Sequence, residues 1–149
     1  MYLPSGELHA YLEGAAVELM ANSDNVLRGG LTPKHIDVDE LLEILNFAYD
    51  KVDILRPEGH DNNEGLYPAA AEEFLLSVIS VREGSIFESS RKRSVEMMIC
   101  MEGGDAHVID LSSGDTLSLT KGTSIIVPAS VEQYRIEGEA TIYKAMVPL

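Results

Sequence analysis

Two basic residues near the start of the chain, Arg28 and Lys34, are the side chains whose type and spacing first suggest chemistry. They lie in residues 22–34 (NSDNVLRGGLTPK), where glycine and proline interrupt the backbone pattern. Guanidinium and ammonium groups are hydrogen-bond donors only, so fixed positive charge on such a loop suits an anionic small molecule. His9, thirteen residues before Asn22, adds an imidazole, which is the commonest metal-ligating side chain.

Neither chemistry is settled by these residues alone. Arg28 can equally be a solvated surface arginine, and the asparagines of the same loop can serve only as turn residues. The histidines and the single cysteine include no His-x-His or Cys-x-x-Cys pair, whereas zinc usually takes three or four protein ligands. Residue types and spacing therefore predict no complete metal site. The histidines and the cysteine considered are His9, His35, His60, His107 and Cys100.

The charge balance limits the partners to be expected. The formal net charge is −14, from 25 acidic residues against 11 Lys and Arg, and such a field repels nucleic acid and anionic membranes. No apolar stretch approaches the roughly 18 residues of a membrane span, and the N-terminus has no signal-peptide pattern. One lone cysteine favours a reducing compartment. We therefore expect a cytoplasmic protein with no nucleic-acid or membrane partner.

The segments that would position the basic loop read as two strands and a helix. Residues 2–21 are expected to form two strands around a turn at Glu13 and Gly14, and period two would place Glu7 and His9 on one face. Residues 38–49 carry apolar side chains at helical spacing, and Asp37 is a suitable N-cap. Residues 56–68 are polar and aperiodic, which is typical of a linker.

The remainder of the chain reads as short strands separated by glycine-containing turns. One such turn is expected at Gly103 and Gly104. This spacing predicts an antiparallel sandwich or barrel. The expected strands cover residues 74–81, 86–90, 95–101, 106–111, 116–119, 124–128, 133–136 and 140–146.

Three nearly continuous pieces, residues 4–12 (PSGELHAYL), 18–28 (ELMANSDNVLR) and 30–34 (GLTPK), resemble a known sequence. They are similar to the end of the catalytic domain of type I mannose-6-phosphate isomerases, the zinc-dependent phosphomannose isomerases. Residues 114–129 resemble the second half of a cupin jelly roll, and the C-terminal part resembles the second cupin domain of that family.

The resemblance implies a fold and a division of the chain. The expected fold is all-β, a cupin or jelly-roll barrel with one short helix, plus the terminal strands of a second, catalytic cupin barrel. Residues 1–37 would carry the C-terminal strands and active-site loop of the catalytic domain. Residues 38–68 would form the helix and linker, and residues 69–149 the C-terminal cupin domain, which we expect to hold no metal.

Carried over residue by residue, the resemblance makes His9 a Zn²⁺ ligand and Arg28 the catalytic arginine. Glu18 and Lys34 correspond to substrate-binding positions. The two roles open to Glu18 are orienting a hydroxyl group and carrying a proton. The other zinc ligands of the family, a Gln, a His and a Glu, belong to segments upstream of those matched here.

The implied reaction interconverts mannose 6-phosphate and fructose 6-phosphate, so the expected small-molecule partner is a sugar phosphate. The alternative is a non-catalytic cupin module that binds a sugar phosphate or acts as an assembly domain. Because unpaired strand edges seek partners, residues 2–21 are also expected to pair with another copy or with an N-terminal segment.

Overall fold

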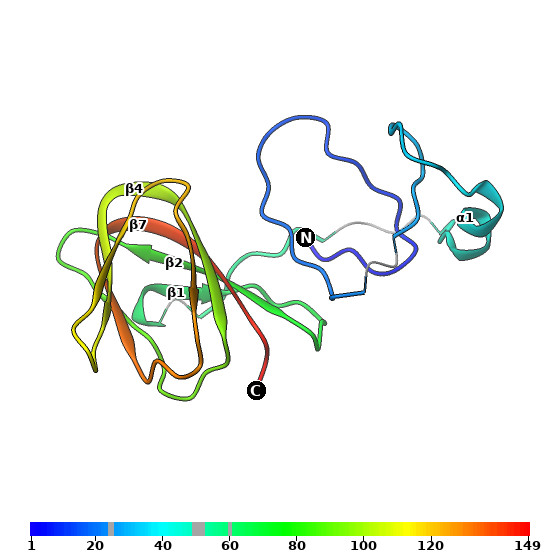
Figure 1. Cartoon of the computed structure of the whole chain (residues 1–149). Helices are drawn as coiled ribbons and strands as arrows, with labels where there is room; N and C mark the ends of the chain where they lie inside the picture. Colours follow the sequence, from blue (N-terminus) through cyan, green and yellow to red (C-terminus); the bar gives the residue numbers. More distant parts are fainter. Residues whose placement is uncertain (24–25, 49–52, 60) are drawn as a thin grey trace. The chain divides into compact units, whose positions relative to one another are not determined.

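The computed structural model describes residues 1–23, 26–48, 53–59 and 61–149. The chain divides into two compact units, a first unit of Met1–Ile54 and a second unit of Leu55–Leu149. Figure 1 shows the helix α1 in the first unit and the strands in the second. Among the residues singled out above, Asp24, Asn25, Tyr49 and His60 lie outside the described ones.

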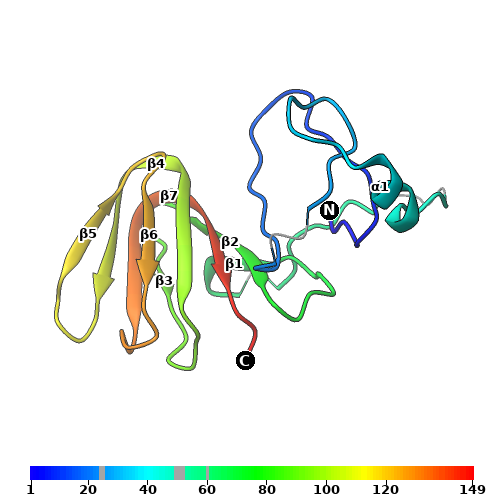
Figure 2. The same ribbon diagram turned by 45° about the vertical axis from the view of Figure 1, so that its right-hand side comes forward.

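The second unit is an antiparallel β-structure, as the strand spacing predicted. Strands β1, β2, β7, β4 and β5 are neighbours in that order, while β3 pairs with β7 and β6 pairs with β4. The strands curve around a common interior (Figures 1 and 2). Their bounds are β1 Glu64–Leu66, β2 Leu75–Val81, β3 Phe87–Glu88, β4 Glu96–Asp110, β5 Thr116–Leu119, β6 Ser124–Val127 and β7 Tyr134–Met146, preceded by a 3₁₀ turn at Asp61–Asn63.

Two long strands, β4 and β7, replace four of the expected short ones. The turn predicted at Gly103 and Gly104 is wrong, because β4 continues through it with β-bulges at Cys100/Glu102 and Gly103/Asp105. Gly103 has φ +138°, and a Cβ there would lie 2.6 Å from the Glu139 carbonyl oxygen. Glycine therefore permits a close approach of two strands here, and does not mark their ends.

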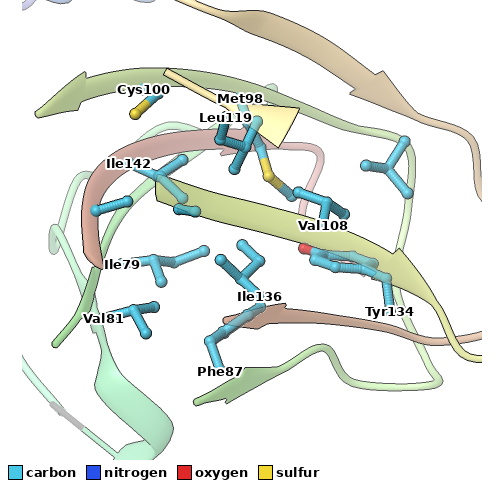
Figure 3. Close-up of a cluster of buried hydrophobic side chains, with 13 residues drawn as sticks. Ile79, Val81, Phe87, Met98, Cys100, Val108, Leu119, Tyr134, Ile136 and Ile142 are labelled. Carbon is cyan, nitrogen blue, oxygen red and sulfur yellow. The ribbon is translucent and has the colours of Figure 1, made fainter. Parts of the chain in front are cut away.

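Alternating side chains of these strands fill the interior of the second unit. Figure 3 shows them. The ring centroids of Phe87 and Tyr134 are 5.9 Å apart. Removing this apolar surface from water is the main force that stabilises the unit. The buried apolar residues are Ile79, Val81, Phe87, Met98, Cys100, Ala106, Val108, Leu119, Val127, Tyr134, Ile136, Ala140 and Ile142.

One end of the interior holds a buried network of charges. Nζ of Lys144 on β7 lies 3.1 Å from Glu96 on β4 and 2.9 Å from Glu64 on β1. The Tyr134 hydroxyl donates to the other Glu96 oxygen at 2.8 Å, and Arg93 approaches that oxygen to 3.5 Å. Burial, followed by the Glu96 charge, raises the pKa of Tyr134. Lys144 thus ties three strands together, and β1 falls within the segment expected to be helix and linker.

The helix of the first unit, α1, spans Val38–Ile44. The predicted cap is confirmed, because an Asp37 carboxylate oxygen accepts a hydrogen bond from the Glu40 backbone N–H at 3.2 Å. The helix ends before the predicted limit, since Leu45 is extended and the Asn46 N–H donates to the Gly6 carbonyl at 3.0 Å. A bond to residue 6 therefore replaces the next helical hydrogen bond.

The two strands predicted in residues 2–21 are wrong. Gly14 does adopt a bend with φ +112°, but residues 1–23 contain no strand. A β-strand needs a neighbour to bond its backbone, and the described backbone of the first unit offers no ladder. In the ranges 1–23, 26–48 and 53–54 no residue is buried. The first unit is therefore coil with one short helix.

Candidate functional site

His9, Tyr11 and Glu18 come together in the first unit, where the Glu13–Gly14 bend returns the chain on itself. Nε2 of His9 lies 3.8 Å from Oε1 of Glu18, and their side chains are 45% and 52% exposed. The His9 and Tyr11 rings meet edge to face at 6.2 Å. Hydrogen bonding to Glu18, with a smaller contribution from burial, raises the pKa of Tyr11. The structure therefore places two of the four predicted site residues beside each other.

The orientation of the His9 ring follows from its backbone contact. Nδ1 of His9 lies 2.9 Å from the Glu7 carbonyl oxygen. Because a carbonyl oxygen only accepts, Nδ1 carries the proton in this contact and Nε2 keeps the lone pair of the neutral ring. The nitrogen that faces Glu18 is thus the one able to bind a metal ion or take up a proton.

Glu7 does not join this pair. Its Oε1 accepts a hydrogen bond from the Asn46 side-chain amide at 2.9 Å, next to the Gly6–Asn46 backbone bond. The expectation that Glu7 and His9 share one face of a strand is wrong, because the segment is not a strand and the carboxylate of Glu7 is used to hold the end of α1.

The predicted basic loop approaches the His9 segment through a glycine. Gly29, the residue after Arg28, lies against the end of the Leu8 side chain, next to His9, so a side chain at position 29 would require Leu8 to move. Arg28 itself is exposed.

Lys34 lies at the end of the same loop. Its backbone N–H donates to Oγ1 of Thr32 at 3.2 Å, and its side chain is exposed. Leu31 has φ +50°, a conformation uncommon for a branched residue, in the series of bends that precedes Lys34. No contact with His9 or Glu18 is recorded for Lys34 in the described part of the chain.

A pocket of about 400 Å³ opens beside Glu18. Its walls combine one aromatic hydroxyl, two carboxylates and three small residues, which is a composition that can accept hydroxyl groups of a polar ligand. The lining residues are Tyr11, Glu13, Gly14, Ala15, Ala16 and Glu18.

The described residues of the first unit do not form a zinc site by themselves. Across residues 1–23, 26–48, 53–59 and 61–149, no group of three or more His, Cys, Asp or Glu side chains is placed to hold a metal ion. His9 and Glu18 offer two donors, whereas zinc needs three or four protein ligands. A zinc ion at His9 would therefore need ligands from outside the described residues.

Tyr11 is the site residue that the sequence reasoning missed. It lies two positions after His9, and the two rings meet edge to face at 6.2 Å. That period-two spacing from a candidate ligand was visible in the sequence, and a tyrosine hydroxyl able to bond Glu18 is the chemistry it could have suggested.

The antiparallel strands of the second unit, closed around one apolar interior, define a protein of the cupin class. Residues 63–147 match the family model of the mannose-6-phosphate isomerase cupin domain, which is more than half of the chain. The chain belongs to this family.

Curated relatives and solved structures agree with that assignment. The chain is 33% identical over 145 residues to mannose-6-phosphate isomerase of Escherichia coli, a match that covers 95% of this chain and 35% of that protein. It is 31% identical to a probable mannose-6-phosphate isomerase of Caenorhabditis elegans, over 94% of this chain and 34% of the relative. The crystal structure of the apo form of mannose 6-phosphate isomerase from Salmonella typhimurium aligns with a TM-score of 0.70 and 27% identity, covering 87% of this chain and 32% of that one.

These matches also show how much of the relatives is represented. The chain spans about a third of the length of the curated relatives that it matches. No helix in the described residues is long and apolar enough to cross a membrane.

Proposed function

We propose that this chain supplies one part of the active site of a mannose-6-phosphate isomerase, which interconverts mannose 6-phosphate and fructose 6-phosphate. The observation that carries the proposal is the contact between His9 and Glu18 beside the loop of Arg28, in a chain of this family. His9 and Glu18 are thus neighbours, and Leu8, next to His9, lies against Gly29, next to Arg28.

Arg28 is the proposed catalytic residue. Moving a proton between C1 and C2 of a sugar develops negative charge on the oxygens of an enediol. A guanidinium group keeps its charge at any working pH and donates several hydrogen bonds in one plane, so it stabilises that charge when it faces those oxygens. The exposed position of Arg28 makes this approach possible.

Glu18 and Lys34 are the proposed substrate-binding residues. The Glu18 carboxylate lines the pocket and is held between His9 and Tyr11, so it can accept a hydrogen bond from a sugar hydroxyl or take a proton from it. The Lys34 ammonium group is a compact positive charge that suits the phosphate of the substrate.

His9 is the proposed contribution of this chain to a Zn²⁺ site. Its Nε2 lone pair is the donor, and the remaining ligands would come from outside the described residues. We also propose that the enzyme works in the cytoplasm, because its single cysteine is buried as a thiol, and a lone thiol needs no oxidising compartment.

The proposal is tested by transplanting the chain into an isomerase that is already complete. The matched third of the Escherichia coli relative is replaced by these 149 residues, and mannose-6-phosphate turnover and zinc per polypeptide are measured. Arg28→Ala should lower kcat about 10²–10³-fold, the effect of removing one donor that stabilises an oxyanion, with zinc content unchanged. Arg91→Ala, a surface arginine paired with Glu132, is the matched control and should leave kcat unchanged.

Normal turnover in the Arg28→Ala chimaera would remove Arg28 from the mechanism. The isolated chain should bind less than one zinc per polypeptide and show no turnover, because its described residues lack a third ligand. A chain that binds no zinc in either context, yet retains mannose-6-phosphate affinity, would favour the non-catalytic cupin module.

A further inference from the structure

The chain just beyond helix α1 is tied to the residues that precede His9. The Asn46 backbone N–H donates to the Gly6 carbonyl oxygen at 3.0 Å, and the Asn46 side-chain amide donates to Oε1 of Glu7 at 2.9 Å. The Glu7 carbonyl oxygen in turn accepts the hydrogen bond from Nδ1 of His9 at 2.9 Å. A path of hydrogen bonds therefore runs from Asn46 to the His9 ring.

Gly6 allows this path to form. It has φ +82°, and a Cβ there would lie 2.6 Å from the Ile44 carbonyl oxygen and 3.3 Å from the Asn46 backbone nitrogen. Both of these are backbone atoms, so a side chain at position 6 would push the end of α1 away. The close approach of Glu7 and Asn46 thus depends on glycine at this position.

The amide group of Asn46 is fixed at both ends. Its Nδ2 donates to the Glu7 carboxylate, and its Oδ1 accepts from the Ala48 backbone N–H at 3.0 Å. Turning the amide over would place an oxygen against the carboxylate and an NH₂ group against an N–H donor. Only one orientation of the amide therefore satisfies both neighbours, and in that orientation Asn46 holds Glu7.

Hydrogen bonds are the means left to this unit for holding His9. In the ranges 1–23, 26–48 and 53–54 no residue is buried, and the His9 side chain is 45% exposed. A half-exposed ring is not locked by packed neighbours, whereas a metal ligand or catalytic group needs its orientation fixed. Directional bonds from a neighbouring segment can supply that constraint.

We propose that Glu7 and Asn46 are positioning residues for His9. They hold the Glu7 carbonyl oxygen where it keeps the proton of the neutral ring on Nδ1, and this leaves the lone pair on Nε2, the nitrogen 3.8 Å from Glu18. The inference rests on the proposed function in one respect, the use of that lone pair for Zn²⁺. A metal-binding histidine typically donates its other N–H to a carbonyl or carboxylate oxygen, and loss of such a partner costs about 10–100-fold in metal affinity.

The first test measures the position of the proton directly. Long-range proton–nitrogen NMR of the purified chain at about pH 9, well above the usual histidine pKa of about 6.5, reports which ring nitrogen carries it. A solvated neutral histidine carries its proton mainly on Nε2, and exposed His35 should show that preference. His9 should instead carry its proton mainly on Nδ1.

Two nearly isosteric variants separate the hydrogen-bond path from a general loss of structure. Asn46→Asp keeps the Oδ1 acceptor for Ala48 but places a carboxylate against Glu7, so His9 should revert to the Nε2–H form. Glu7→Gln keeps an oxygen that can accept from Asn46 and should leave His9 as in the wild type. Glu43→Ala, which removes an exposed carboxylate from α1, is the matched control and should also change nothing.

The second test measures zinc affinity, by competition with a chelator, in the chimaera described above. Asn46→Asp should weaken zinc binding about 10–100-fold, whereas Glu7→Gln and Glu43→Ala should leave it unchanged. Circular dichroism checks the fold of each variant. Asn46→Ala, which removes the donor without adding charge, replaces Asn46→Asp if that variant loses structure, and the same reversion of His9 is expected.

The outcomes keep this inference apart from the proposed function. A wild-type His9 that carries its proton mainly on Nε2 would overturn the inference. So would an Nδ1–H form that persists in Asn46→Asp and Asn46→Ala, or an effect of Glu43→Ala as large as theirs. Full zinc content in a His9→Ala chimaera would instead remove His9 from the metal site, and the tautomer measurement would still decide the role of Glu7 and Asn46.

Discussion

The two units of this chain differ in what holds their backbone in place. In the second unit, long strands share hydrogen-bond ladders around a buried apolar interior and a buried network of charges. The described residues of the first unit include none that is buried, and α1 is the only regular element among them. Its contacts are local caps, one bond between Asn46 and Gly6, and side-chain pairs at the surface.

The comparison teaches where function and stability lie in this chain. The residues proposed for catalysis, His9, Glu18, Arg28 and Lys34, all belong to the first unit, which has little packing of its own. Catalytic groups need to be held within about 0.5 Å of their working geometry by packed neighbours. The second unit has such packing and carries none of the proposed site residues. Substitutions at Lys144, Ile142 and Tyr67, each compared with a control elsewhere in the chain, probe this division.

The largest effect is expected from Lys144→Ala. This change leaves Glu96 and Glu64 with one buried cation fewer, and breaking a buried ion pair by removing one partner costs about 3–5 kcal/mol. Arg91→Ala removes an exposed pair with Glu132 and should cost at most about 1 kcal/mol. Urea unfolding, followed by circular dichroism, measures the loss of unfolding free energy in both variants. Equal losses in the two variants would contradict a structural role for the buried network.

A matched pair of apolar truncations compares the units directly. Ile142→Ala removes a fully buried side chain from the second unit and should lower the free energy of unfolding by about 2–5 kcal/mol. Leu12 is 91% exposed, so Leu12→Ala should change the free energy of unfolding by less than about 0.5 kcal/mol. A cost for Leu12→Ala close to that of Ile142→Ala would mean that the first unit also has a core.

The smallest expected effect concerns Tyr67 at high pH. Burial, then a hydrogen bond to Tyr143, raises the pKa of Tyr67 from 10.0 to about 12. Because the folded pKa is the higher one, the stability that this residue contributes is complete below pH 10 and is lost as the pH rises toward 12. Tyr67→Phe should therefore lose less unfolding free energy between pH 9.5 and 11.5 than the wild type.

The matched control for that measurement is Tyr2→Phe, which removes a hydroxyl from the first unit. It should follow the wild-type dependence of stability on pH. The idea fails if Tyr67→Phe and the wild type lose the same unfolding free energy over this pH range, or if Tyr2→Phe reproduces the effect.

The sequence predicted the features that depend on neighbouring residues. The N-cap at Asp37 and the strand at residues 116–119 were both found, since capping and two-residue alternation are local signals. The all-β class followed from many such signals taken together. The family resemblance to mannose-6-phosphate isomerases was confirmed by the match to residues 63–147.

The features that depend on distant residues were not predictable in this way. Whether Gly103 ends a strand or allows a bulge is decided by Glu139 and Ala140 on β7, and whether residues 2–21 form strands is decided by the presence of a pairing partner. In the candidate site, the contact of His9 with Glu18 depends on the reversal of the chain at Glu13 and Gly14, whereas the two-residue spacing of Tyr11 from His9 was a local signal. The roles of His9, Arg28, Glu18 and Lys34 stay predictions.

The division between the two units is tested most directly by native-state hydrogen exchange, resolved by residue, on the purified chain. Amides of β2, β4 and β7 should exchange only through global unfolding, so their protection should equal the free energy measured in urea. Most described amides of the first unit should exchange with little protection, because few of them have hydrogen-bond partners. Protection of residues 2–21 as strong as that of β7 would contradict the account.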